Sequence, residues 1–290
     1  MILPVYNRAD VLARAITSVL EQKLREFELI VVDDGSSDDS ATLAESFEDD
    51  RVRVIRLDEN RGGNAARNEG VRAARAPLIA FLDSDDRYLP GKLGWIVAEF
   101  ARRPEIDLLV DSFIKVQPPG SRKAEIVRRN PIINDREQFR TALFRRQLWK
   151  ATPAISVRRD VAISAGLFDE TLRRLQDFDF LIRLSQIANC VSTDEVLWVK
   201  YWDVNAISAQ DNMIAANIEL VSRHPEYLSS RTYRPGLAYA LRLSLWRRLK
   251  RGDIAGMARD VRVLADAFGT GEAVRLSWES LFPRPRLVGS

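Results

Sequence analysis

The chain has 290 residues, 46% of them hydrophobic and 29% charged, which are the proportions of a folded globular protein and exclude a disordered or fibrous one. Its one cysteine, Cys190, can form no internal disulfide and fits a buried position in a reducing compartment. Its one histidine, His224, cannot form a multi-histidine metal site and would have to be the histidine of any Ser-His-Asp triad, so neither kind of site is expected. The net charge is only +3, and with neither an apolar run of the ~20 residues that span a bilayer nor the residue order of a signal peptide, we expect a cytoplasmic protein.

The first third of the sequence alternates short aliphatic runs with helical segments, which is the pattern of a parallel sheet with crossover helices. Strands are predicted at residues 1–3, 27–32, 52–57, 77–82 and 107–116. Helices are predicted at residues 9–22, 40–47, 64–74 and 92–102. These elements predict an α/β domain with a mostly parallel sheet flanked by helices.

The rest of the chain is less regular. Residues 118–131 are polar and basic with three prolines, which predicts a surface loop that could act as a lid. A helix at 134–150, an extended segment at 154–157 and an amphipathic helix at 177–189 follow, and from about residue 209 the chain is predicted to be mostly helical, with His224 an ordinary surface residue.

The C-terminal part is basic. Residues 229–290 hold twelve Arg and Lys against five Asp and Glu, with Trp246 and Trp278 among them. This pattern fits peripheral contact with the anionic inner face of a membrane, and it fits a solvated helical face equally well. Nucleic acid is not an expected partner, because no RNA- or DNA-binding motif accompanies the charge.

Three polar clusters begin where predicted parallel strands end. They are Pro4-Val5-Tyr6-Asn7, Asp33-Asp34-Gly35-Ser36-Ser37-Asp38 and Asp83-Ser84-Asp85-Asp86. Ligands of open α/β sheets bind beyond the carboxyl ends of the strands, so we expect the clusters to converge on one site. Asp34 can accept hydrogen bonds from a nucleobase N–H or from ribose hydroxyls; the alternative is a turn in which Ser37 or Asp38 caps the next helix.

The third cluster has the chemistry of a metal site. Asp83 and Asp85 are two residues apart and point the same way in an extended segment. Mg²⁺ and Mn²⁺ prefer oxygen ligands and are commonly held by one or two carboxylates together with substrate phosphates. Three aspartates in four residues repel one another unless something compensates, which disfavours a purely structural role. We therefore predict a divalent cation at Asp85 and Asp83 that neutralises a departing diphosphate.

Two further segments carry candidate chemistry. Arg61-Gly62-Gly63-Asn64-Ala65-Ala66-Arg67-Asn68 places a glycine turn and two arginines at a helix amino terminus, which is a natural anion site, although Asn64 can be no more than a helix cap. In Gln176-Asp177-Phe178-Asp179 a carboxylate lies at the start of an amphipathic helix. Asp177 can cap that helix or, with a sugar donor across the cleft, deprotonate an acceptor hydroxyl.

Five motifs taken together resemble glycosyltransferase family 2, whose members have the GT-A fold. They are Pro4-Val5-Tyr6-Asn7, Val31-Val32-Asp33-Asp34-Gly35-Ser36, Arg67-Asn68-Glu69-Gly70, Phe81-Leu82-Asp83-Ser84-Asp85-Asp86 and Gln176-Asp177-Phe178-Asp179. The resemblance covers about residues 1–205. It implies a nucleotide-sugar-binding half at 1–116, an acceptor-binding half at 117–205 and, beyond it, a helical C-terminal region at 206–290. Only three residues precede Pro4, so the first strand is short or begins upstream.

The resemblance also implies an activity. A sugar would move with inversion from a nucleoside-diphosphate sugar, by the family pattern a UDP-sugar, to a hydroxyl of a glycan or lipid-linked acceptor in cell-envelope polysaccharide synthesis. Asp85 would bind Mn²⁺ or Mg²⁺, with Asp83 at the metal or the ribose, and Asp177 would be the catalytic base, with Gln176 where the family usually has Glu. The residues that would contact the nucleotide sugar are Pro4, Tyr6, Asp34, Gly63, Arg67, Asp83 and Ser84.

Two rival readings remain at this point. A sugar-nucleotidyltransferase uses similar folds and paired carboxylates to attack a phosphate, and it would not need Asp177. A non-catalytic sugar-nucleotide-binding protein would need only the donor site. In such a protein mutation would be expected to have replaced at least one of the four carboxylates that catalysis needs, but all four are present: Asp34, Asp83, Asp85 and Asp177.

Overall fold

The computed structural model describes residues 1–202 and 213–279 of the chain. The chain divides into two compact units. Unit 1 comprises Met1–Phe139, Trp149–Leu172 and Gln176–Val204, and unit 2 comprises Arg140–Leu148, Arg173–Leu175 and the chain from Asn205 onward. The predicted boundary between residues 205 and 206 lies outside the described residues, and the assignment of donor and acceptor halves to 1–116 and 117–205 stays a prediction.

Unit 1 is built on a sheet with two hydrogen-bonded parts. Its strands are β1 (Ile2–Val5), β2 (Leu29–Asp33), β3 (Val52–Arg56), β4 (Leu78–Ala80), β5 (Arg87–Tyr88), β6 (Leu108–Val116), β7 (Glu125–Arg128), β8 (Ile155–Arg158) and β9 (Cys190–Lys200). One part runs β1-β2-β3 and the other β4-β8-β6-β9-β5, with β7 paired to β6. The parts meet where Ile2 pairs in parallel with Phe81 and the Leu82 N–H donates to the Ile2 carbonyl at 3.0 Å. The four-residue β1 is therefore an interior strand, which explains why all its residues are buried.

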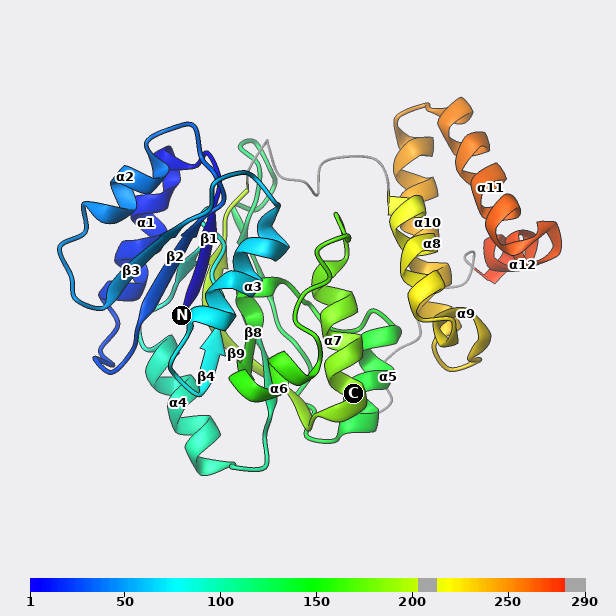
Figure 1. Ribbon diagram of the computed structural model, residues 1–290. Coiled ribbons are helices and arrows are strands. Elements are labelled where there is room, and N and C mark those ends of the chain that lie inside the picture. The colour runs from blue at the N-terminus through cyan, green and yellow to red at the C-terminus, as the bar shows by residue number, and fades with distance from the viewer. Residues whose placement is uncertain (203–212, 280–290) are drawn as a thin grey trace. The chain divides into compact units, whose positions relative to one another are not determined.

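Helices cover both faces of this sheet (Figure 1). They are α1 (Ala9–Leu20), α2 (Ser40–Glu45), α3 (Gly63–Ala73), α4 (Lys92–Arg102), α6 (Arg159–Ser164) and α7 (Gln176–Ile187), with a 3₁₀ turn at Thr152–Ala154. The helix α5 (Arg136–Phe144) begins in unit 1 and continues into unit 2. α3 lies close against β1, because a Cβ added at Gly70 would meet the Ile2 side chain at 2.5 Å. Glycine is needed there to let the helix backbone approach the strand.

The elements predicted for the first 116 residues are confirmed, as is the buried position of Cys190. The sheet is more mixed than expected, since β8 runs antiparallel to β4 and β6 and β5 runs antiparallel to β9. The loop predicted over 118–131 is wrong in part: Glu125–Arg128 form β7, whose two β-branched residues suit an edge strand paired to β6. The long strand β9 is not among the predicted elements.

Unit 2 is helical, as predicted. Its helices are α8 (Met213–Arg223), α9 (Glu226–Ser229), α10 (Arg234–Lys250), α11 (Ile254–Phe268) and α12 (Thr270–Glu279). The surface position predicted for His224 is wrong, because its residue is only 5% exposed. Its carbonyl accepts the Tyr227 N–H at 2.9 Å in the tight turn from α8 to α9. None of the helices described combines the length and apolar character that crossing a bilayer requires.

Candidate active site

The predicted polar clusters follow neighbouring strands at one edge of the sheet. Val5 is paired with Asp33 in the parallel β1–β2 ladder, and Ile2 is paired in parallel with Phe81, two residues before the acidic cluster. The Asp34 N–H then donates to the Val5 carbonyl at 2.9 Å. The turns after β1, β2 and β4 thus leave the sheet side by side, as the strand pattern predicted.

The first two turns are bonded to each other through Asn7. This residue has φ of +50°, a conformation that asparagine tolerates better than most residues. Its Oδ1 accepts the Ser37 N–H at 2.8 Å, and its own N–H donates to Ser36 Oγ at 3.0 Å. Of the predicted donor contacts nearby, Pro4 is buried and Tyr6 is 45% exposed. The Tyr6 ring is therefore presented at the edge where a nucleobase is expected.

Asp34 holds the loop that precedes α3. Its two carboxylate oxygens accept the N–H groups of Arg61 at 2.9 Å and Gly62 at 2.7 Å, and the residue is only 2% exposed. Burial raises the pKa of Asp34 even though these two hydrogen bonds oppose the rise. Each carboxylate oxygen has a second lone pair, so the group can hold the loop and still accept a donor from a ligand.

Arg67 and Gly63 lie beside the acidic cluster. The Arg67 guanidinium donates to Asp83 Oδ1 at 2.7 Å, with side chains 9% and 24% exposed respectively. A Cβ at Gly63 would lie 3.3 Å from this guanidinium, so the glycine leaves the arginine its space. The predicted residues Gly63, Arg67 and Asp83 are thus neighbours, and Ser84 follows them with 9% exposure.

The helix-cap reading of Asn64 is wrong. Its amide donates to the carbonyls of Asp169 at 2.9 Å and Leu172 at 2.8 Å. One turn later Asn68 donates to the Phe168 carbonyl at 2.8 Å and accepts the Phe168 N–H at 2.9 Å. α3 therefore uses two asparagines to hold the distant loop 168–172. The helical spacing of two buried amides is a signal for such a role, but it does not reveal the partner.

The carboxylates of Asp83-Ser84-Asp85-Asp86, here called the acidic turn, can share a cation. One oxygen from each of Asp83, Asp85 and Asp86 lies within 4.8 Å of the others. An all-oxygen set of this kind suits Mg²⁺ or Mn²⁺ and fits the metal predicted at Asp85 and Asp83. The acidic turn therefore fits an Asp-x-Asp metal motif.

Asp86 has a different position from its neighbours, because it is fully buried. Its oxygens accept the Tyr201 N–H at 2.9 Å and the Lys200 ammonium at 3.5 Å. Burial raises the pKa of Asp86 well above the ordinary value, Lys200 opposes the rise, and the other two aspartates add to it. Burial lowers the pKa of Lys200, but the three nearby carboxylates have the larger effect, so the pKa of Lys200 is raised. Asp86 thus ties the acidic turn to the end of β9.

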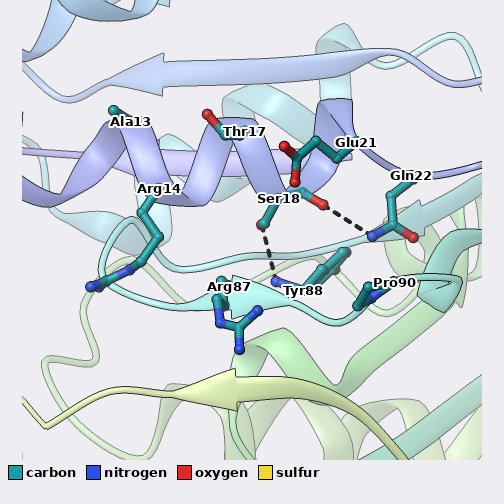
Figure 2. A pocket seen from close by; sticks show the side chains of 9 residues that line it. All are labelled: Ala13, Arg14, Thr17, Ser18, Glu21, Gln22, Arg87, Tyr88 and Pro90. Carbon is teal, nitrogen blue, oxygen red and sulfur yellow. Dashed lines mark hydrogen bonds between the residues drawn. The ribbon is translucent and has the colours of Figure 1, made fainter.

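Arg14 of α1 also contacts the acidic turn. Its guanidinium donates to the Asp85 carbonyl at 2.5 Å and stacks on the Tyr201 ring at 3.8 Å. Figure 2 shows it at the side of a hollow of about 320 Å³ between α1 and β5, where the Tyr88 N–H donates to the Ser18 hydroxyl at 3.0 Å. None of the predicted donor residues lines this hollow.

Asp177 is the second residue of α7 and is half-buried. Its carboxylate accepts the N–H of the next residue, Phe178, at 2.8 Å, so a local capping contact is present. Two aromatic contacts connect α7 to the segment before the acidic turn. The ring centroids of Phe180 and Phe168 are 4.2 Å apart with the rings tilted, and Phe168 meets Phe81, two residues before Asp83, edge to face at 5.4 Å. The role of Asp177 as a base stays a prediction.

The sheet, its flanking helices and the acidic turn place the protein in the α/β GT-A class. The family model described as Glycosyl transferase family 2 matches residues 1–157, more than half of the chain. The protein belongs to this glycosyltransferase family.

One relative is the succinoglycan biosynthesis protein ExoU of Rhizobium meliloti, 43% identical over 101 residues that cover 34% of this chain and 29% of ExoU. Across four curated relatives the chain spans between 26% and 62% of their length.

Solved structures share the fold over nearly the whole chain. S. aureus TarS 1-349 in complex with UDP-GlcNAc has a TM-score of 0.64 at 18% identity and covers 96% of this chain and 89% of its own. The mannosyltransferase PcManGT of Pyrobaculum calidifontis, in complex with GDP-Man and Mn²⁺, has a TM-score of 0.59 at 16% identity, with 97% and 86% covered. At sequence identities this low, the structural similarity is evidence for the fold alone.

Proposed function

We propose that the protein transfers a sugar from a nucleoside-diphosphate sugar to a hydroxyl of a glycan or lipid-linked acceptor, with inversion at the anomeric carbon. The observation that carries the proposal is that the turns after β1, β2 and β4, with Tyr6, Asp34 and the acidic turn, meet at one sheet edge. A nucleotide binding at Asp34 would place its diphosphate towards carboxylates suited to a divalent cation.

The residues divide the work by their chemistry. Asp34, which keeps lone pairs beside the loop N–H groups, accepts the N–H of a base such as uracil while Tyr6 flanks the ring. Asp85 and Asp83 would hold Mn²⁺ or Mg²⁺, and that cation would neutralise charge on the departing diphosphate. Asp177 takes the proton of the acceptor hydroxyl as the acceptor oxygen attacks.

The donor and the setting are proposed from the relatives as well. TarS holds UDP-GlcNAc, which supports a UDP-sugar, and PcManGT holds Mn²⁺, which supports that metal. ExoU is named for succinoglycan biosynthesis, which supports a role in cell-envelope polysaccharide synthesis. We also propose that the protein is cytoplasmic and makes peripheral contact with the inner face of the cell membrane, where a lipid-linked acceptor would be presented.

Calorimetric titration tests the donor site. UDP, GDP, dTDP and CDP are each titrated with and without Mn²⁺, and one nucleotide is expected to bind tightly only with the metal. Asp85→Ala is expected to remove this metal dependence. The control is Asp50→Ala, an exposed carboxylate outside the site, which should bind as the unmodified protein does. Binding of no nucleotide, or unchanged binding by Asp85→Ala, would contradict the donor and metal assignments.

The base is tested with the donor that titration identifies. Asp177→Asn is expected to abolish sugar transfer while leaving the nucleotide affinity within about twofold, because the amide cannot take a proton. An active Asp177→Asn variant would remove Asp177 as the base. Conversion of the nucleotide sugar and labelled diphosphate into labelled nucleoside triphosphate and sugar 1-phosphate, unaffected by this variant, would instead support a nucleotidyltransferase.

A further inference from the structure

The turn between α10 and α11 carries an unusual set of exposed side chains. α10 ends at Lys250, Gly252 takes a φ of +69°, and Asp253 begins α11 by accepting the Gly256 N–H at 2.8 Å. The two helices form a hairpin whose turn points away from α9 and α12 (Figure 1). Residues 246–254, here called the hairpin tip, therefore project from unit 2.

Three large apolar residues of the hairpin tip face solvent. Trp246 is 51% exposed, Leu249 52% and Ile254 55%. Covering any of them would remove apolar surface from water. Trp246 and Leu249 are three residues apart on α10 and so lie on the same face of that helix, and Ile254 is the first residue of α11. The hairpin tip thus presents large apolar side chains from both helices to solvent.

The charge of the hairpin tip is positive. Arg247, Lys250 and Arg251 are exposed, and the Lys250 ammonium lies 3.8 Å from the centre of the Trp246 ring. The one acid of the segment, Asp253, is bound by Arg248 at 2.6 Å and so does not offset the exposed cations. Basic residues suit the carboxyl end of a helix, but this helix dipole effect does not account for the exposed apolar residues among them.

We infer that the hairpin tip binds an anionic lipid bilayer, with its apolar side chains in the interface and its cations at the headgroups. Basic residues alternating with Trp, Leu and Ile are the combination that anchors proteins at such interfaces. A protein partner with an acidic groove would need matching concave surface, whereas a bilayer adapts to a projecting tip. The inference deepens the membrane contact proposed above and does not depend on the sugar-transfer reaction.

Vesicle co-sedimentation of the full chain tests the inference. Vesicles of phosphatidylcholine with 30% phosphatidylglycerol are expected to bind the protein, and pure phosphatidylcholine vesicles are expected to bind it far less. Replacing Arg247, Lys250 and Arg251 by Ser should weaken binding about fivefold per residue, hence about 100-fold together. The double variant Trp246→Ser/Leu249→Ser should weaken binding by a factor that does not change with salt concentration.

The matched control is Val274→Ser, an apolar residue of α12 that is 64% exposed and outside the hairpin tip, and it should bind vesicles as the unmodified protein does. Nucleotide titration of every variant separates this inference from the donor site, since donor binding should be unchanged in all of them. Equal binding to both kinds of vesicle, or unchanged binding by the triple Ser variant, would overturn the inference. Self-association abolished by Trp246→Ser/Leu249→Ser, without vesicle binding, would overturn it in favour of a second copy of the chain.

Discussion

A buried ion pair beneath the acidic turn offers the sharpest test of the fold around the site. Lys92 of α4 is bonded to Asp111 of β6, and both side chains are fully buried. The Lys92 ammonium also lies 4.6 Å from the Tyr88 ring, and the Tyr88 hydroxyl donates to the Phe81 carbonyl at 2.6 Å. Lys92→Met leaves an unpaired buried carboxylate and is expected to lower the free energy of unfolding by about 3–5 kcal/mol at pH 8.

The pH dependence follows from the titration of Asp111. Burial raises the pKa of Asp111 to about 7 against the opposing charge of Lys92, and relative to an ordinary aspartate this corresponds to about 4 kcal/mol against ionisation in the fold. Its folded-state pKa is raised, so its stabilising contribution is complete below pH 4 and is lost as the pH rises through 7. Without Lys92 the pKa rises further. The loss caused by Lys92→Met should therefore be smaller at pH 5.5, where Asp111 is protonated, than at pH 8, by up to about 1.4 kcal/mol for a pKa of about 7.

Urea unfolding followed by circular dichroism at pH 8 and pH 5.5 measures both values. The control is Arg102→Met at the other end of α4, whose side chain is 68% exposed and paired to Glu99, and it should cost less than about 1 kcal/mol at either pH. The double variant Lys92→Met/Asp111→Leu should recover most of the loss, because neither charge is then left alone. A loss equal at the two pH values would refute the reasoning.

Two further outcomes are expected. Gly70→Ala places a Cβ 2.5 Å from a β1 side chain and should lower the free energy of unfolding by about 1–3 kcal/mol. Gly94→Ala, at a position of α4 with open space around it, should raise the free energy of unfolding by up to about 1 kcal/mol. Equal effects of the two substitutions would contradict the close packing of α3 against β1. Arg14→Met removes a hydrogen bond to the Asp85 carbonyl and should weaken Mn²⁺-dependent nucleotide binding about tenfold. The control Thr17→Ala, on the same helix, should leave this binding unchanged. An effect of Arg14→Met on metal-free binding instead would contradict a role of Arg14 through the acidic turn.

The sequence identified the strand ends because aliphatic runs followed by acids are local signals. It placed Asp34 and the acidic turn at one edge, and the β1–β2 pairing agrees. It could not predict that Asn68 binds the backbone of Phe168, because the two residues are far apart in the chain and a side-chain amide can pair with any donor or acceptor. Asp86 was likewise counted only as a repelling charge, since its partner at the end of β9 lies over a hundred residues away.

The repulsion that the sequence predicted among the three aspartates is met by cations from separate elements. Arg67 of α3 is paired with Asp83, and Lys200 of β9 with Asp86, which is also bound by a main-chain N–H. These contacts offset the charges of Asp83 and Asp86 from within the protein. Asp85 is half-buried whereas Asp86 is fully buried, so Asp85 is the more accessible of the two to a divalent cation that arrives with a nucleotide. Replacement of Asp85, and not of Asp86, is therefore expected to remove the metal dependence of donor binding.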